Sequence, residues 1–358
     1  MDTNPSLYDA FAGADALGPY EVVHIAKRTI GLDAIVVVDN LVRGPALAPV
    51  RLTREGSTEE ALGLARAITL SAALHDLPFG GGAVLVMGEG DEPAARRHSI
   101  FDGLGAAMLP LRACIPVPDA GVDNGSFARL SARVGRGMGL EPEALARATA
   151  AGLAAAIAEA APRAGFRLAG ARLALQGFGQ VGRGLAALLA REGVRLVAAS
   201  DRGGMAADPA GLDLDSLLAA KQATGSVASY SGGAGGAPSP FPSCDIWCPT
   251  ARPDALDLGA AARLDARLVV EATFGALAPE AERVLVEREI LVLPDLVAAA
   301  GGLAAAARLL APDTVPGGDV VAATLRRILR DPKSRRAPLR DIAATLAARR
   351  FPRGRRRA

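Results

Sequence analysis

The six residues Gly177-Phe178-Gly179-Gln180-Val181-Gly182 decide the fold, because they follow a short apolar segment and open a segment of helical character. The apolar segment covers residues 173–176, and apolar residues then recur at helical spacing up to Gly193. A second β-type segment covers residues 194–199, and Asp201 stands at its end, 24 residues beyond Gly177. This order of strand, glycine turn, helix and strand predicts a Rossmann-type dinucleotide-binding unit.

Each glycine of the turn has its own expected role. Gly177 permits the tight turn, Gly179 lets a pyrophosphate approach backbone N–H groups, and Gly182 lets the helix pack on the strand. Asp201 is expected to accept hydrogen bonds from the ribose hydroxyls and to repel a 2′-phosphate, whereas the neighbouring Arg202 is suited to accommodate that phosphate. The pattern therefore favours NAD over NADP, and a glycine turn that binds nothing is the alternative. The predicted cofactor-binding residues of this segment are Gly177, Phe178, Gly179, Gln180, Val181, Gly182, Asp201 and Arg202.

Strand-like and helix-like segments alternate around this unit. Short β-branched or apolar segments predict strands at residues 172–176, 195–200, 244–248, 268–271 and 290–293. An alanine-rich helix is expected at residues 142–161, and the Gly/Ser/Pro-rich residues 225–243 indicate a loop. Strands and helices in alternation predict a parallel sheet covered by helices.

The N-terminal third has a different pattern. Two adjacent strands are expected at residues 21–25 and 33–38. Ser57 and Glu60 form a capping-box signal before a helical run of apolar residues, and this run leads into Gly80-Gly81-Gly82. Three consecutive glycines suggest a backbone that something approaches closely, with a flexible loop as the alternative. Near the C-terminus, helices are expected at residues 320–330 and 339–350.

The bulk composition narrows the class of protein and of partner. The chain of 358 residues is long enough for two domains, and its net charge of +2 gives no global field that would attract nucleic acid. Three scattered cysteines form neither a disulfide framework nor a metal site, which fits a reducing cytoplasm. No stretch indicates a membrane span, and the basic run at residues 349–357 is expected to be a solvated tail. We therefore expect a cytoplasmic protein with no metal, no nucleic-acid partner and no membrane partner.

Several further motifs follow one another in a fixed order. They lie at residues 43–51, 64–69, 77–82, 176–182, 200–201, 211–213, 245–251, 279–281, 290–295 and 300–302. Together they resemble the glutamate/leucine/phenylalanine/valine dehydrogenases, and most closely the leucine, valine and phenylalanine enzymes. The resemblance implies a homo-oligomer that converts an L-amino acid to a 2-oxo acid with NAD(P). It further implies an α/β fold with a substrate and oligomerisation domain at residues 1–137, a Rossmann domain at 138–318, and C-terminal helices at 319–358 that return to the first domain.

The resemblance also assigns roles to single residues. Asp119, in Asp119-Ala120-Gly121-Val122, matches the aspartate of proton transfer, and Thr149 matches a threonine associated with the nicotinamide carboxamide. Gly80, Gly81 and Gly82 match the glycines of the substrate site. In the family, a lysine after these glycines activates water, and a second lysine twelve residues earlier holds the substrate carboxylate. This chain has Ala83 and Ser71 at those two positions.

The missing lysines change the expected chemistry. Losing a general acid or base typically costs about two to four orders of magnitude in rate, so the resemblance predicts an amino acid dehydrogenase of weak or altered activity. Ala48-Pro49 replace paired glycines of the family, and Phe274 and Ala299 replace asparagines near the nicotinamide half of the cofactor.

Three explanations stay open. The first is an active enzyme with a rebuilt site, in which Asp119 is the base and Arg43 or Arg51 clamps the substrate carboxylate. The simpler interpretation of Arg51 is an ion pair at a strand end, and that of Arg43 is a solvated charge. The second explanation is a catalytically inactive NAD(P)-binding homologue with a regulatory or partner-subunit role. The third is altered chemistry on the same scaffold, such as hydride transfer that needs no activated water.

Overall fold

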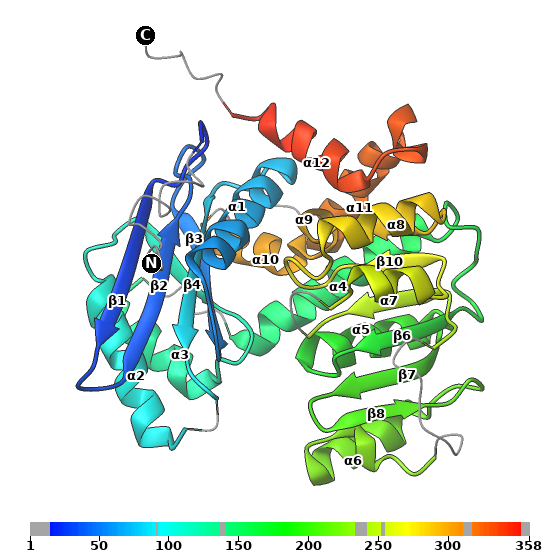
Figure 1. The fold of residues 1–358 in the computed structure, drawn as a ribbon, viewed down its shortest axis with the longest axis horizontal. Coiled ribbons are helices and arrows are strands. Elements are labelled where there is room, and N and C mark those ends of the chain that lie inside the picture. The colour runs from blue at the N-terminus through cyan, green and yellow to red at the C-terminus, as the bar shows by residue number, and fades with distance from the viewer. Residues whose placement is uncertain are drawn as a thin grey trace, which may run out of the picture. The chain divides into compact units, whose positions relative to one another are not determined.

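The computed structural model describes residues 15–90, 92–136, 141–232, 242–251, 255–310 and 317–351. Within these ranges the chain forms two compact units, each with its own sheet (Figure 1). Unit 1 contains the described residues of Met1–Pro142, Leu309–Pro312 and Leu346–Ala358, and unit 2 contains those of Glu143–Arg308 and Asp313–Thr345. This confirms the predicted two-domain α/β fold. The finer domain limits stay predictions, and most of the predicted basic tail lies outside the described residues.

Unit 1 is built on a sheet whose five described strands lie in the order β1-β2-β4-β3-β5, blue to cyan in Figure 1. The strands are β1 (Glu21–Lys27), β2 (Leu32–Val38), β3 (Ala46–Thr53), β4 (Gly80–Met87) and β5 (Cys114–Pro118). β1 and β2 are the predicted adjacent strands, and they pair antiparallel. β4 runs antiparallel to β2 and parallel to β3, which in turn is parallel to β5.

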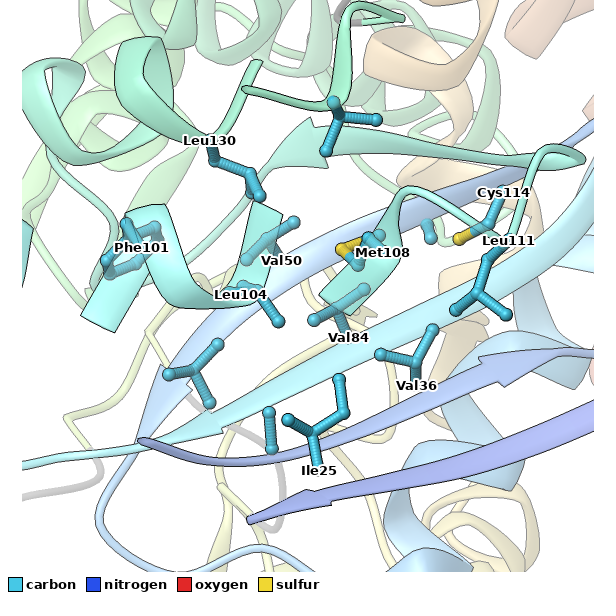
Figure 2. Close-up of a cluster of buried hydrophobic side chains, with 14 of the residues drawn as sticks. Ile25, Val36, Val50, Val84, Phe101, Leu104, Met108, Leu111, Cys114 and Leu130 are labelled. Atoms are coloured by element: carbon cyan, nitrogen blue, oxygen red, sulfur yellow. The ribbon is translucent and has the colours of Figure 1, made fainter. Parts of the chain in front are cut away.

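Helices cover both faces of this sheet. α1 (Thr58–Leu74) covers one face and begins at the predicted cap, where the Ser57 hydroxyl accepts a hydrogen bond from the Glu60 N–H at 3.0 Å. α2 (Ala94–Met108) and α3 (Asn124–Val134) cover the other face. There, alternate strand residues meet the apolar side chains of both helices in one core (Figure 2), whose labelled members are Ile25, Val36, Val50, Val84, Phe101, Leu104, Met108, Leu111, Cys114 and Leu130. Because strand side chains alternate between faces, Ala83 lies on the α1 face, opposite Val84.

Gly80, Gly81 and Gly82 begin strand β4 and are buried, so the alternative of a flexible loop is wrong. The backbone that approaches them closely is the protein's own. A Cβ atom at Gly80 would overlap the carbonyl oxygen of Asn40, and one at Gly81 would overlap that of Ala65 on α1. The triplet therefore lets α1 and the segment after β2 lie directly on β4.

Unit 2 contains a sheet whose six described strands lie in the order β11-β10-β9-β6-β7-β8. The strands are β6 (Arg172–Gln176), β7 (Arg195–Asp201), β8 (Gly204–Ala207), β9 (Ile246–Pro249), β10 (Leu268–Val270) and β11 (Leu291–Leu293). From β11 to β7 all neighbours are parallel, as the alternating pattern predicted. The edge strand β8 is antiparallel to β7, and the sequence did not predict it because a four-residue segment of glycine, methionine and alanines carries little strand signal.

Helices precede, connect and follow these strands. They are α4 (Pro142–Ala160), α5 (Gln180–Arg191), α6 (Leu214–Thr224), α7 (Leu258–Arg263), α8 (Pro279–Glu287), α9 (Asp295–Ala298) and α10 (Ala300–Leu310), followed by α11 (Gly317–Leu329) and α12 (Leu339–Ala348). Short 3-10 helices occur at η2 (Val227–Ser229), inside the predicted loop, and at η3 (Pro332–Arg335). Residues 233–241 of that loop lie outside the described residues. No helix in the described ranges is both long and apolar enough to cross a membrane.

Arg340 of α12 joins three carboxylates that are buried in unit 2. Its guanidinium donates to Glu271 at 2.7 and 2.8 Å, to Glu282 at 2.7 Å and to Asp295 at 2.6 Å. Burial, together with the charge of Asp295, raises the pKa of Glu271 well above its usual value. One arginine thus fastens α12 to the end of β10, to α8 and to α9, and the excess of carboxylates favours a proton on Glu271.

We expect Gly81→Ala to destabilise unit 1 by about 3 kcal/mol or more, because the new methyl group would overlap rigid backbone. Gly63→Ala is the matched control. Gly63 lies in α1 with no described atom within 4 Å of an added Cβ, so that variant should gain about 1 kcal/mol of helix stability. Urea unfolding measures both. Equal stabilities of the two variants would contradict the packing role of Gly81.

We expect Arg340→Met to cost about 3–5 kcal/mol, because it leaves three buried carboxylates without their cation. Arg326→Met, which breaks the exposed pair with Glu159, should leave the stability unchanged. Urea unfolding at pH 7 measures both variants. A loss in Arg340→Met no larger than that in Arg326→Met would show that the cluster does not hold α12.

Glu271→Gln should make the stability less dependent on pH. Because the pKa of Glu271 is raised in the folded chain, folding takes up a proton, and this group's contribution falls as the pH rises above the ordinary glutamate range. The free energy of unfolding of the variant, relative to the unaltered chain, should therefore be higher at pH 8 than at pH 5. A relative stability that is constant over this range would contradict the raised pKa.

Candidate functional site

Strand β6 leads into the glycine turn at the carboxyl edge of the unit 2 sheet. Gly177 has φ = +112°, a conformation that side chains rarely adopt. A Cβ atom there would lie 2.6 Å from the Thr250 hydroxyl and 2.7 Å from the Ala251 methyl group. A Cβ at Gly182 would overlap the carbonyl oxygen of Gly177. Gly177 and Gly182 are therefore required by the packing of β6, α5 and the segment after β9.

Gly179 differs from both, because no described atom lies within 4 Å of a Cβ built on it. It caps the N-terminus of α5 and provides no side-chain oxygen to the first N–H groups of the helix. Phe178 is buried, Val181 is half-buried, and Gln180 is exposed beside Gly179. Open backbone N–H groups at a helix N-terminus attract anions, so the turn fits the pyrophosphate of a dinucleotide.

Asp201 ends β7 beside this turn, and four groups of unit 2 donate to its carboxylate. Oδ1 accepts from the Gly203 N–H at 2.9 Å and the Ser226 hydroxyl at 2.8 Å, while Oδ2 accepts from Lys221 Nζ at 2.7 Å and the Val227 N–H at 2.8 Å. Burial alone would raise the pKa of Asp201, but the Lys221 hydrogen bond and the other three donors lower it to about 2. The carboxylate is therefore ionised and paired.

Thr149 lies on α4, where its hydroxyl donates to the Leu145 carbonyl oxygen at 2.9 Å. A Cβ atom at Gly302 would lie 2.6 Å from the Thr149 hydroxyl oxygen, and one at Gly301 would overlap the Ala148 carbonyl. These glycines bring the start of α10 directly onto α4. Ala299, just before them, is buried.

The two positions at which the resemblance would place lysines, Ser71 and Ala83, both lie on the α1 side of the unit 1 sheet. Ala83 follows the glycine triplet in β4 and is fully buried. Ser71, on α1, is also fully buried, and its hydroxyl has no hydrogen-bond partner among the described residues. Neither position carries a charge or a titratable group.

The remaining candidates of unit 1 are held in ion pairs. The nearly buried Arg51 side chain on β3 donates to Asp119 at 3.0 Å and lies 3.9 Å from Glu60. Arg43 donates to Asp76 at 2.7 Å and to the Leu77 carbonyl at 3.0 Å, so it is not the solvated charge of the simpler interpretation. Burial alone would raise the pKa of Asp76, but Arg43 and Arg350 outweigh it and hold that pKa below its usual value. The two arginines proposed as carboxylate clamps are thus each bound to a carboxylate of the chain.

Sequence reasoning missed the partners of these groups. Lys221 and Ser226 reach Asp201 from α6 and from the turn before η2, and no motif marks them. Asp39, which is buried after β2, accepts hydrogen bonds from Arg66 at 2.9 Å and from Thr69 at 2.6 Å. Arg66 and Thr69 belong to a stretch that resembles the family, but that stretch gave no sign that an aspartate lay opposite. Among the described residues, no group of three or more His, Cys, Asp or Glu residues is arranged to hold a metal.

The fold and the glycine turn define a two-unit α/β protein with a Rossmann-type unit. The family model described as "Glutamate/Leucine/Phenylalanine/Valine dehydrogenase" matches residues 143–310, and the model of its dimerisation domain matches residues 21–130. Glutamate dehydrogenase of Thermotoga maritima is 32% identical over 300 residues, which cover 75% of this chain and 69% of that protein. The chain therefore belongs to the Glu/Leu/Phe/Val dehydrogenase family.

Three further comparisons cover different shares of the chain. An NAD-specific glutamate dehydrogenase of Staphylococcus aureus is 39% identical over 158 residues, which cover 44% of this chain but only 38% of that protein. The solved hetero-hexameric glutamate dehydrogenase of Thermus thermophilus, in a leucine-bound form, has a TM-score of 0.81 and 29% identity, covering 93% of this chain and 88% of that one. L-tryptophan dehydrogenase of Nostoc punctiforme, with a TM-score of 0.63 and 21% identity over 96% of this chain and 98% of that one, shares the fold.

Gly179→Ala and Gly182→Ala should distinguish a glycine of the turn that faces open space from one that packing requires. Gly182→Ala is expected to lower the stability by about 1–3 kcal/mol, because its methyl group would overlap the Gly177 carbonyl. Gly179→Ala should keep the stability within about 0.5 kcal/mol, since its Cβ would point into open space. Thermal unfolding of both variants measures this. Equal destabilisation would contradict the open position of Gly179.

Proposed function

We propose that the chain binds a nicotinamide dinucleotide on unit 2 and is an oxidoreductase of the amino acid dehydrogenase type. The observation that carries this proposal is the open α5 N-terminus at Gly179, where no side chain accepts a hydrogen bond from the first N–H groups and which lies between two glycines that packing requires. The names of the Staphylococcus aureus and Thermotoga maritima relatives support it. The word NAD-specific in the first name supports NAD as a cofactor.

The proposed substrate is an L-amino acid, converted to its 2-oxo acid. When bound, the nicotinamide supplies the acceptor of the hydride. The part proposed for unit 1 is to bind the substrate and move protons, with Asp119 as the proton acceptor and Arg51 beside it to orient its carboxylate. Arg43, Gly80, Gly81 and Gly82 are the other proposed substrate contacts, and Thr149 the proposed contact of the carboxamide. The resemblance implies a homo-oligomer.

Weak or altered turnover is part of the proposal. Adding water to an imine needs a base whose pKa lies near the working pH and which lies within hydrogen-bond reach of the water. Ala83 offers no such base. Holding the substrate carboxylate needs a cation, and Ser71 is uncharged. Arg51 and Arg43, the two candidate carboxylate clamps, are paired with Asp119 and Asp76.

The second candidate function is a catalytically inactive partner subunit that binds NAD(P). The absence of a charge at both buried positions favours it, and so does the description of the Thermus thermophilus relative as hetero-hexameric. The two candidates differ in one respect that can be measured. An enzyme turns over an amino acid on its own, whereas an inactive subunit binds the cofactor and does not.

Fluorescence titration with NADH and NADPH, followed by assays of a panel of L-amino acids and of 2-oxo acids with ammonia, tests both candidates. Cofactor binding with slow turnover of an amino acid is the expected result. Binding without any turnover would favour the inactive subunit. Absence of binding to either cofactor would overturn the proposed function.

The double variant Ser71→Lys/Ala83→Lys should raise the turnover by about two to four orders of magnitude if the missing lysines limit it. Ser71→Met/Ala83→Met is the matched control, because methionine has a similar length and no charge. Both positions are buried, so an unchanged NADH affinity must first show that each variant is folded. Equal turnover of the two folded double variants would contradict the role assigned to the lysines.

A further inference from the structure

Asp201 has no hydrogen-bonding capacity left for a ligand. A carboxylate has about four lone-pair sites, and four donors within unit 2 contact this one at 2.7–2.9 Å. Its side chain is only 10% exposed. The expected acceptance of ribose hydroxyls would therefore require one of these donors to leave.

The place of Asp201 makes this important for the proposed dinucleotide site. Ser200 pairs with Gln176, and the Gly177 N–H donates to the Ser200 carbonyl at 3.0 Å. Asp201 thus comes directly after the residue that is bonded to the glycine turn. In Rossmann units the acidic residue at this strand end faces the adenosine ribose and discriminates NAD from NADP.

The charges at this strand end favour an anion. Lys221 neutralises Asp201 across 2.7 Å, and its side chain is 20% exposed. Arg202, the next residue, is exposed, and its side chain makes no hydrogen bond or ion pair with other described residues. Asp201, Lys221 and Arg202 together carry one net positive charge. A carboxylate that is paired in this way repels a phosphate far less than a free one.

We propose that Lys221 is a specificity-determining residue, which occupies and neutralises Asp201 so that the ribose end of the site admits a 2′-phosphate bound by Arg202. The chain then accepts NADP(H) as well as NAD(H). This inference rests on the proposed function, since it concerns the same dinucleotide site. Lys221 acts through Asp201, to which it donates directly, whereas Arg202 contacts the ligand.

The test measures the dissociation constants of NADH and NADPH for the unaltered chain and for variants of Lys221, Lys333 and Arg202. For the unaltered chain we expect the two constants to agree within about tenfold. Lys221→Met should weaken the binding of NADPH by about tenfold or more, because it leaves the charge of Asp201 without its cation. The binding of NADH should be unchanged or tighter. Lys221→Arg should retain NADPH binding because it keeps the cation. Lys333→Met is the matched control, since Lys333 is an exposed lysine of η3 and should change neither constant.

Arg202→Gln keeps the inference testable if Lys221→Met does not fold. Arg202 is exposed, so this variant should fold and should lose NADPH affinity by about tenfold, with NADH unaffected. If the unaltered chain binds NADPH more than a hundredfold more weakly than NADH, the inference is overturned and the proposed function still stands. If the ratio of the NADPH and NADH dissociation constants is the same in every folded variant, the inference is also overturned and the proposed function still stands. Binding of neither cofactor would overturn both.

Discussion

The structure depends on contacts between backbone segments that leave no room for a side chain. In unit 1, Gly80 and Gly81 lie directly against the carbonyl groups of Asn40 and of α1, which fixes the helix on the sheet. In unit 2, Gly182 lies against the carbonyl of Gly177, and this contact fixes α5 on β6. Since rigid backbone cannot shift as a side chain can, each contact sets the position of a whole helix. The candidate residues on α1, β4 and α5 take their places from these contacts.

Charge pairing is the second organising feature. The carboxylates of Asp39, Asp119 and Asp201 lie near the strand ends or close behind them, and each is bound to a cation of its own unit: Arg66, Arg51 and Lys221. Such pairing offsets the cost of removing carboxylates from water. It also commits cations that would otherwise be available to a substrate. In unit 1, Ser71 and Ala83 carry no charge, and Arg43 and Arg51 are each bound to a carboxylate of the same unit.

Local patterns predicted the elements whose signals are local. The helix of α1 was expected from its cap at Ser57 and its apolar spacing, and the parallel strands of unit 2 from short β-branched segments. Where a signal was weak or lay far along the chain, prediction failed. β8 carries almost no strand signal, and the Gly80–Gly82 triplet could be taken for a loop because the backbone that presses on it comes from residues 40 and 65. A single sequence shows that a glycine is present but not which distant atom excludes a side chain there.

The sequence by itself determined the two-domain α/β fold, the resemblance to the family and the absence of lysine at Ser71 and Ala83, because all three are properties of residue order. Only the tertiary structure decided how the charges are used. In the folded chain both of those positions are buried, and Arg51 is paired with Asp119. The carboxylate of Asp201 accepts hydrogen bonds from Lys221, Ser226 and Val227. These partners are 20 to 68 residues apart in the chain. Electrostatic pairing acts over a few ångströms of space, so distance along the chain cannot reveal it.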